Sequence, residues 1–444
     1  MKNFPNAFVI ILAAIAFSWI LTFLIPKGYY QRELDTATER TTVIPNSYQQ
    51  KEAPHLSAFD LLLAIPKGIA GRADLIVLIL LLGGCFYLIE QTGALNQGLN
   101  QLIVLLEGKE SIALIFLSTL FLTAGFTIAL QEEIIALTPI LLLFGRRLGY
   151  NTATTIYASF GSAIVGAAFS PINPFGVIIA QKEAEIELLS GSSFRIIILC
   201  IAAIIWAIYI IQYAKTHRVD KSIETFVVEK LTIRNKVILI LLALTLGVVT
   251  YGLIALSWGF NEMSACFFAL GILCGLIANF GINKTTEIYV AGFKEMIFAC
   301  IIIGLANSIS IILSEGQIMD TIVYGLFGPL KDLPLSVSAV LMMVSHSILH
   351  FPISSYSGQA ILTMPILAPL ADLIGLSRQV GVLAYQYGAI MMDVIIPTNG
   401  GLMAILAIGG IKYNNWIKFI IKPTLLMLAI GALAILIAVQ IGYN

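Results

Sequence analysis

The sequence predicts an all-α polytopic membrane protein with two inverted repeats, each holding a re-entrant helical hairpin and a broken transmembrane helix. The prediction rests on high hydrophobicity, apolar runs of spanning length, and a pattern that recurs along the chain. Of the 444 residues, 59% are hydrophobic and 11% are charged, whereas soluble domains carry roughly 25% charged residues. Most of the outer surface must therefore face lipid.

Apolar runs of about the 20 residues needed to cross a bilayer separate the charged segments. The first run, residues 7–25, is too long for a signal-peptide core, so we expect a retained transmembrane helix. The basic segment 215–236 belongs in the cytoplasm by the positive-inside rule. Counting spans from there gives a multi-pass protein of the inner (cytoplasmic) membrane with its N-terminus in the cytoplasm. Arg72 and Arg378 fall outside and oppose this orientation.

Two stretches resemble each other at a fixed spacing of 226 residues. Residues 132–180 align without a gap over 358–406, and the matches include Pro171 with Pro397 and Asn173 with Asn399. When the spans are counted, the first copy starts outside the membrane and the second starts inside. We therefore expect inverted repeats, with a site near the membrane midplane where the two repeats meet. The resulting divisions are 1–57 (first helix and external loop), 58–213 (repeat one), 214–283 (cytoplasmic loop and two linking helices) and 284–444 (repeat two).

Each repeat contains two places that cannot be continuous transmembrane helix. We expect hairpin tips at 125–133, opening to the cytoplasm, and at 352–359, opening to the outside. Broken helices are expected at 170–176 and 397–401, where proline removes a donor and glycine permits a reversal. Freed backbone groups are tolerated in a membrane only where they are buried in protein or line a cavity. Ordinary proline kinks are the alternative, but the matching positions favour a binding site.

The chemistry of these breaks suits a charged solute. A half-helix that starts in the membrane points N–H groups at a carboxylate, and the opposing ends suit Na⁺ or an ammonium group. Candidate ions for coupling are H⁺ and Na⁺, the latter near Asn173 and Asn399, and no other cofactor is expected. The candidate binding residues are Thr127, Gln131, Glu132, Glu133, Asn173, Pro174, Ser354, Ser355, Ser357, Gly358, Gln359, Asp393, Thr398, Asn399 and Gly400.

Three of these candidates are carboxylates within apolar sequence: Glu132, Glu133 and Asp393. Intramembrane carboxylates are costly and usually face a cavity with a partner. Such a group could bind a cation or carry a coupling proton. For Glu132 or Glu133 the alternative is that the side chain caps the second arm of the hairpin.

His346 and His350 are four residues apart and share a helix face, a spacing that could hold Zn²⁺ in a membrane metalloenzyme. No glutamate lies between them, so we favour hydrogen-bonded histidines near the outer water interface and expect no transition metal. The net charge of zero gives no argument for a nucleic-acid partner.

The motifs resemble those of YfcC-like carriers over nearly the whole chain. The similarity is carried by Gln131-Glu132-Glu133, by 172–175, and by the run from Ser357 to Asp372. This family groups with the anaerobic C4-dicarboxylate carriers and the arginine/ornithine-type antiporters of the ion transporter superfamily. The resemblance implies a homodimer with a scaffold domain and an elevator-like transport domain, interleaved across the repeats.

These observations predict a secondary active transporter for a small carboxylate-bearing solute. The solute is an amino acid or a C4-dicarboxylate, and the helix starts together with the three carboxylates favour a zwitterionic or cationic amino acid. Movement is expected to be elevator-like and coupled to Na⁺, H⁺ or solute exchange. A metalloenzyme using His346 and His350 and a channel are the alternatives.

Overall fold

The computed structural model describes residues 7–35, 40–44, 47–95, 97–98, 101, 109–131, 133–219, 231–256 and 258–443. Within these residues, six helices are long and apolar enough to cross a membrane. They are α3 (Ala73–Gln91), α5 (Glu110–Ile128), α10 (Ser192–Thr216), α12 (Phe260–Ile277), the Met296–Glu315 part of α13 (Gly281–Glu315), and α19 (Tyr413–Gln440). The chain is thus an almost entirely helical, multi-pass membrane protein.

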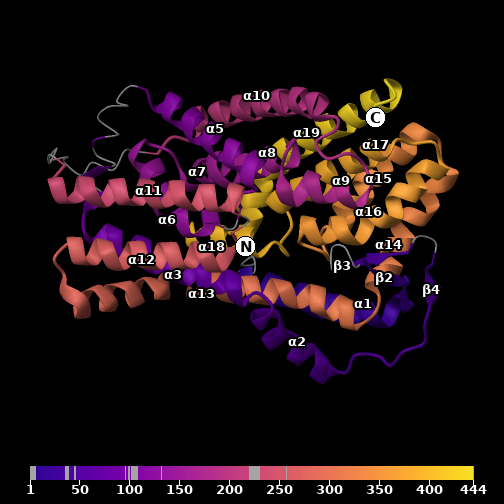
Figure 1. Cartoon of the computed structure of the whole chain (residues 1–444), viewed down its shortest axis with the longest axis horizontal. Coiled ribbons are helices and arrows are strands. Elements are labelled where there is room, and N and C mark those ends of the chain that lie inside the picture. Colours follow the sequence, from indigo (N-terminus) through magenta and orange to yellow (C-terminus); the bar gives the residue numbers. More distant parts are fainter. Residues whose placement is uncertain are drawn as a thin grey trace.

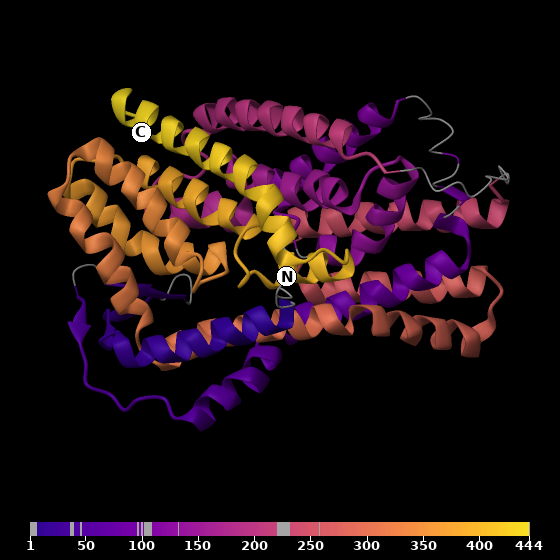
Figure 2. The ribbon, with the colours of Figure 1, turned by 180° about the vertical axis from the view of Figure 1, so that it is seen from behind.

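The helices form two layers (Figure 1). A base layer runs along one edge and contains α1 (Ala7–Leu24), α2 (Ala58–Ala70), α3, α12 and α13, with α13 packed against each of the other four. An upper layer contains the elements from α5 to α10 and from α15 to α19, and the same division is visible from behind (Figure 2). Helix α11 (Ile233–Ala255) packs on α12.

Each half of the chain contains the same order of elements in the upper layer. In the first half, helix α5 and helix α6 (Glu133–Arg147) meet at a tip. In the second half, helix α15 (Leu335–Leu349) and helix α16 (Tyr356–Leu373) meet in the same way. An interrupted helix follows each pair. The first comprises α7 (Thr152–Ile156), π-helical η1 (Tyr157–Gly161), α8 (Ser162–Ala168), π-helical η2 (Pro174–Ile178) and α9 (Ile179–Glu183). The second comprises α17 (Arg378–Tyr385), π-helical η4 (Gln386–Ile390), 3₁₀-helical η5 (Met391–Val394) and α18 (Gly400–Ile408). The interruptions lie where proline and glycine predict them, while the inversion of the repeats and the re-entrant path of the hairpins stay predictions.

An asparagine restarts the helix after each interruption. Asn173 Oδ1 accepts the N–H groups of Phe175 at 2.9 Å and Gly176 at 2.8 Å, with Pro174 in the first helical position. Asn399 Oδ1 accepts the N–H of Leu402 at 2.8 Å. An asparagine cap satisfies N–H groups that a helix start otherwise leaves unpaired. Asparagine recurs at this point because a helix that begins inside the protein requires a cap.

The segment between α1 and α2, predicted to be external, departs from the all-α expectation. It contains two antiparallel two-stranded sheets: β1 (Gly28–Tyr29) with β4 (Gln49–Gln50), and β2 (Arg32–Asp35) with β3 (Arg40–Val43). Arg32 forms an ion pair of 2.7 Å with Asp320 at the start of α14 (Met319–Phe327), which η3 (Gly328–Asp332) follows. Tyr48 stacks on Tyr324 with ring centroids 4.2 Å apart. The sheets pair backbone groups within an extended segment, and these contacts hold the segment against α14.

Helices α5 and α8 cross at two glycines. A Cβ atom at Gly125 would lie 2.0 Å from the carbonyl oxygen of Ala163, and one at Gly166 would lie 2.1 Å from that of Leu122. Small residues allow helix backbones in membranes to approach this closely. The crossing joins the first hairpin to the first broken helix.

Gly166→Ala is therefore expected to destabilise the folded protein by about 1–3 kcal/mol, because the added methyl group meets backbone atoms that cannot rotate away. Gly247→Ala is the matched control, since a Cβ there meets no heavy atom within 4 Å and alanine is the better helix former. Thermal unfolding of the purified proteins in detergent measures both effects. A Gly166→Ala protein as stable as Gly247→Ala would contradict the close crossing.

Candidate substrate site

A central cavity of about 340 Å³ lies where the two hairpin tips, the second helix break and the base layer meet. The upper layer contributes Ile128, Ala129, Gln131, Glu133, Phe175, Ser354, Ser355, Tyr356, Ser357, Asp393, Thr398, Asn399, Gly400 and Gly401. Arg72, Leu75, Ile303, Ala306, Asn307, Met263, Phe260, Gly259 and Trp258 line the opposite side. Polar groups from segments far apart in the sequence thus surround one small space.

The structure brings many of the sequence-predicted residues to this cavity and leaves others outside its lining. Gln131, Glu133, Ser354, Ser355, Ser357, Asp393, Thr398, Asn399 and Gly400 line it. The residues outside the lining are Thr127, Asn173, Pro174, Gly358 and Gln359, and Glu132 lies outside the described residues. Thr127 donates to the carbonyl of Thr123 in its own helix at 2.7 Å. Asn173 is buried and donates to the carbonyl of Gly125 at 3.3 Å, so it joins the first break to the first tip.

Three charged side chains line the central cavity: Arg72, Glu133 and Asp393. Arg72 precedes α3 in the base layer, whereas both carboxylates belong to the upper layer. Glu133 Oε2 accepts the N–H of Gln131 at 3.2 Å, so this residue also has the capping role weighed as an alternative. The sequence reasoning missed Arg72: Arg378 departs from the positive-inside rule in the same way and does not line the cavity.

A buried hydrogen-bonded network extends from the cavity wall into the second hairpin. His350 Nε2 lies 2.9 Å from Asp393 Oδ1, and His350 Nδ1 lies 2.7 Å from Gln359 Oε1. Gln359 Nε2 lies 3.0 Å from His346 Nδ1. Asn399 Nδ2 donates to Asp393 Oδ1 at 2.5 Å. Both histidines are fully buried and hydrogen-bonded, as expected, and His350 contacts Asp393. Their position near the outer water interface stays a prediction.

Two polar atoms in the wall of the cavity lack a hydrogen-bond partner among the described residues: Asp393 Oδ2 and Thr398 Oγ1. Each side chain is 1% exposed. Leaving a buried polar group unpaired costs about 1–3 kcal/mol, and more for a charged one. These atoms therefore provide acceptors for a ligand with a positive or hydrogen-bond-donating group.

Among the described residues, this geometry shows no set of ligands for either metal that the sequence suggested, Na⁺ near Asn173 and Asn399 or Zn²⁺ at His346 and His350. The side-chain oxygens of Asn173 and Asn399 already accept backbone N–H groups as helix caps. Among the residues that the structure describes, there is no group of three or more His, Cys, Asp or Glu side chains able to hold a metal ion. Coupling by Na⁺ stays a prediction.

Residues that sequence reasoning missed tie the two broken helices together. Gln386 in η4 donates to the carbonyl of Ser170, in the first break, at 2.6 Å. Ser170 Oγ donates to the carbonyl of Phe126 in the first hairpin at 2.6 Å. The fully buried Arg195 of α10 donates to Gln386 Oε1 at 3.3 Å and to Gln379 Oε1 at 2.9 Å. The sequence shows Arg195 only as a single arginine at the predicted outer end of a helix, which does not indicate that it would contact the second broken helix.

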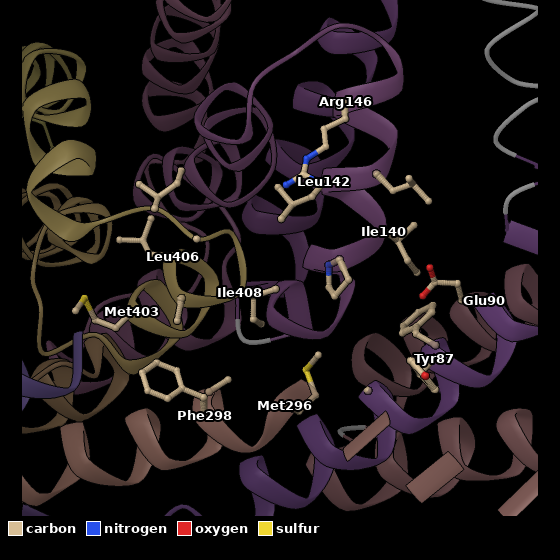
Figure 3. Close-up of a pocket in the computed structure, with 18 of the residues that line it drawn as sticks. Tyr87, Glu90, Ile140, Leu142, Arg146, Met296, Phe298, Met403, Leu406 and Ile408 are labelled. Atoms are coloured by element: carbon tan, nitrogen blue, oxygen red, sulfur yellow. The ribbon is translucent and has the colours of Figure 1, made fainter. Parts of the chain in front are cut away.

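A second cavity, of about 760 Å³, lies further along the same helices (Figure 3). We call it the vestibule. Helices α3, α6, α13 and α18 line both cavities, and the vestibule ends at Glu90, Arg146 and Lys412. Figure 3 shows Arg146 and Glu90 projecting from α6 and α3, which belong to opposite layers. The vestibule therefore lies between the layers, on the side of the central cavity toward the end predicted to be cytoplasmic.

Cysteine labelling is expected to confirm this path. Ala407 lines the vestibule, so Ala407→Cys, in a background with the five native cysteines replaced, should react with a membrane-impermeant thiol reagent from the cytoplasmic side of inside-out vesicles. Ala404→Cys, on the same helix and fully buried, is the matched control and should react far more slowly. Labelling of the Ala407→Cys protein only from the outside would contradict the predicted orientation.

The fold and the cavity define the class of protein: a polytopic membrane transporter with a cavity at its helix breaks that polar and charged side chains help to line. The chain belongs to the C4-dicarboxylate anaerobic carrier family, DcuC, whose family model matches residues 4–440. The resemblance drawn from the sequence motifs is thereby confirmed. The chain is a transporter and not an enzyme, which removes the metalloenzyme alternative.

Two curated relatives match nearly the whole chain. The chain is 30% identical to the putative basic amino acid antiporter YfcC of Escherichia coli K12, over 99% of the chain and 97% of that protein. It is 29% identical to an uncharacterized protein of Haemophilus influenzae over the same shares. Among solved structures, it matches the Alcanivorax borkumensis YdaH transporter (14% identity, TM-score 0.47, 99% of both chains). It also matches Neisseria gonorrhoeae MtrF (15% identity, TM-score 0.43, 99% of this chain and 96% of the other).

Proposed function

We propose that the chain is a secondary active transporter for a basic amino acid. The observation that carries the proposal is the charge of the central cavity, where Arg72 faces a site that also holds Glu133 and Asp393. A basic amino acid has one carboxylate and two cationic groups, which is the complementary set. The unpartnered Asp393 Oδ2 supports the same assignment, as does the description of the Escherichia coli relative as a putative basic amino acid antiporter.

The solute's carboxylate has a suitable place in the proposed site. Helices α16 and α18 begin at the cavity, with Ser355 and Asn399 as their caps. A helix start presents N–H groups and the positive end of its dipole to an anion. Arg72 adds a guanidinium that suits bidentate contact with a carboxylate.

A C4-dicarboxylate is the second candidate. The same two helix starts and the family description support it. It would bring two negative charges to a cavity in which two acidic residues, Glu133 and Asp393, outnumber one basic residue, Arg72, and like charges at close range repel. The cavity charge therefore favours the basic amino acid.

The proposed transport movement is elevator-like, with the upper layer as the transport domain and the base layer as the scaffold. Both cavities lie between these layers, so displacing one layer past the other would carry the site across the membrane. A homodimer joined through the scaffold is part of the proposal. The mass of the purified protein in detergent, measured by light scattering, tests it.

Uptake into proteoliposomes tests the function. Labelled arginine, lysine and ornithine should enter saturably when an ion or solute gradient is applied, whereas succinate and fumarate should not. Assays with and without Na⁺ and pH gradients identify the coupling ion. Saturation at low turnover separates a carrier from a channel, which would give single-channel currents. No flux of either solute class under any gradient would overturn the proposal.

A further inference from the structure

The hydrogen bonds around Gln359 determine where protons lie in the buried network. Gln359 Nε2 is 3.0 Å from the carbonyl oxygen of His346. Only the NH₂ end of the amide can donate to a carbonyl, so the amide oxygen of Gln359 faces His350 Nδ1. That oxygen is an acceptor, and His350 Nδ1 therefore carries a proton.

The remaining contact of His350 requires a further proton. His350 Nε2 lies 2.9 Å from Asp393 Oδ1. Without a proton between them, two lone pairs would face each other at hydrogen-bonding distance. Asn399 cannot supply it, because its own proton already bridges Nδ2 to Asp393 Oδ1. The His350–Asp393 pair thus shares one removable proton, which resides on either the imidazole or the carboxyl group.

Few other titratable or charged groups face this pair. On the hairpin side, His346 is joined to it through Gln359, and the ring of Tyr385 packs edge-on against His346. The Tyr385 hydroxyl donates to the carbonyl of Tyr356 at 2.7 Å. On the cavity side, Glu133 and Arg72 line the same space. Their formal charges are opposite, so among the described residues of the site the pair decides the formal net charge.

With its proton, the pair has a net charge of zero, and without it the pair leaves one negative charge in the wall of the cavity. Asp393 lines this cavity, and its Oδ2 atom has no hydrogen-bond partner among the described residues. We propose that a cationic group of the solute replaces the shared proton of His350 and Asp393, so that solute and proton bind in alternation. An ammonium or guanidinium group pairs with the Asp393 carboxylate while the proton leaves to water and the contact of His350 Nε2 with Asp393 Oδ1 opens. The proton returns, and the contact closes, when the solute departs.

This inference rests on the proposed function and adds its coupling: the carrier exchanges a cationic amino acid for a proton. Because the cation and the proton neutralise the same carboxylate charge, each weakens the binding of the other, and the empty site returns across the membrane with its proton. The exchange needs no separate proton pathway. Binding of the solute lowers the affinity for the proton, and binding of the proton lowers the affinity for the solute by the same factor, as thermodynamic linkage requires.

Binding of lysine to the purified full-length protein in detergent tests the proposal. In weakly buffered solution, a pH indicator should report about one proton released per lysine bound. Calorimetry should show the apparent affinity rising about tenfold per pH unit over the range in which the free protein holds the proton, because one proton competes with one cation. This wild-type measurement requires no variant to fold.

Three variants distinguish the pair from a structural role. Asp393→Asn and His350→Gln should each give an affinity that no longer changes with pH, whatever its absolute value. His217→Gln removes an exposed histidine at the end of α10 and should keep the wild-type slope. A merely structural role would change the affinity of the first two variants and leave the tenfold slope intact.

The outcomes separate this inference from the function on which it rests. Lysine binding without proton release and without a pH slope overturns the exchange mechanism and leaves lysine transport standing. Absence of both lysine binding and lysine flux overturns both proposals. Binding of succinate with uptake of a proton also overturns both, in favour of the dicarboxylate candidate.

Discussion

Replacing Asn399 by alanine is expected to lower solute flux about 100-fold while the protein remains folded. The side chain has two roles at the start of α18: its oxygen caps the helix through Leu402, and its NH₂ group donates to Asp393. Losing a cap costs about 0.5–2 kcal/mol, and losing a hydrogen bond to a charged group costs about 1.5–3 kcal/mol. Both terms are costs in folding stability. The expected loss of flux comes from the lost contact with Asp393 at the site, and a 100-fold change corresponds to roughly 2.7 kcal/mol.

Asn399→Ser separates the two roles, because serine retains a capping oxygen and loses the donor to Asp393. We expect the solute flux of Asn399→Ser to lie between those of wild type and Asn399→Ala. Asn173→Ala, which removes the matching cap in the first break, should also reduce flux without unfolding. Initial rates in proteoliposomes, with thermal unfolding as the folding check, measure all three. Wild-type flux from Asn399→Ala would count against the site.

Arg195→Ala is expected to have the largest effect on stability, with a cost of at least about 3 kcal/mol. The fully buried guanidinium donates to Gln379, Gln386, the carbonyl of Ser190 and the hydroxyl of Tyr443. Removing it leaves several buried acceptors unpaired, at about 1–3 kcal/mol each. Arg195→Lys should be intermediate, because an ammonium group cannot reproduce the planar fork of donors.

Lys215→Ala is the matched control for Arg195→Ala, since Lys215 lies on the same helix and is exposed. Thermal unfolding in detergent should give a much lower midpoint for Arg195→Ala and a midpoint close to wild type for Lys215→Ala. Equal midpoints for the two variants would show that the buried contacts of Arg195 contribute little to stability.

Much of the site could be predicted because its causes are local. Proline at 171 and 397 cannot continue a helix, and the nearby asparagines cap the helix that follows. These effects act within a few residues, so the sequence shows them directly. The apolar runs likewise indicate spanning helices, because lipid demands that backbone groups pair within the segment.

The partners of the buried histidines could not be predicted in this way. The spacing of His346 and His350 showed a shared helix face but not which neighbour would cover it. The structure brings Asp393, 43 residues further along the chain, to His350. Similarly, Arg195 contacts Gln386 across 191 residues. Such contacts depend on how layers pack, and packing is set by many residues together.

By itself, the sequence determined that this protein is a helical membrane transporter with two pairs of helix breaks and polar groups at each. Its composition and its prolines, glycines and asparagines suffice, because bilayer thickness and backbone hydrogen bonding constrain every residue locally. Only the tertiary structure decided which polar groups share a cavity. It brings Arg72 of the base layer to face Asp393 of the upper layer and joins His350 to that carboxylate. The charge balance of the site therefore arises from packing between distant segments, and that balance favours a basic amino acid.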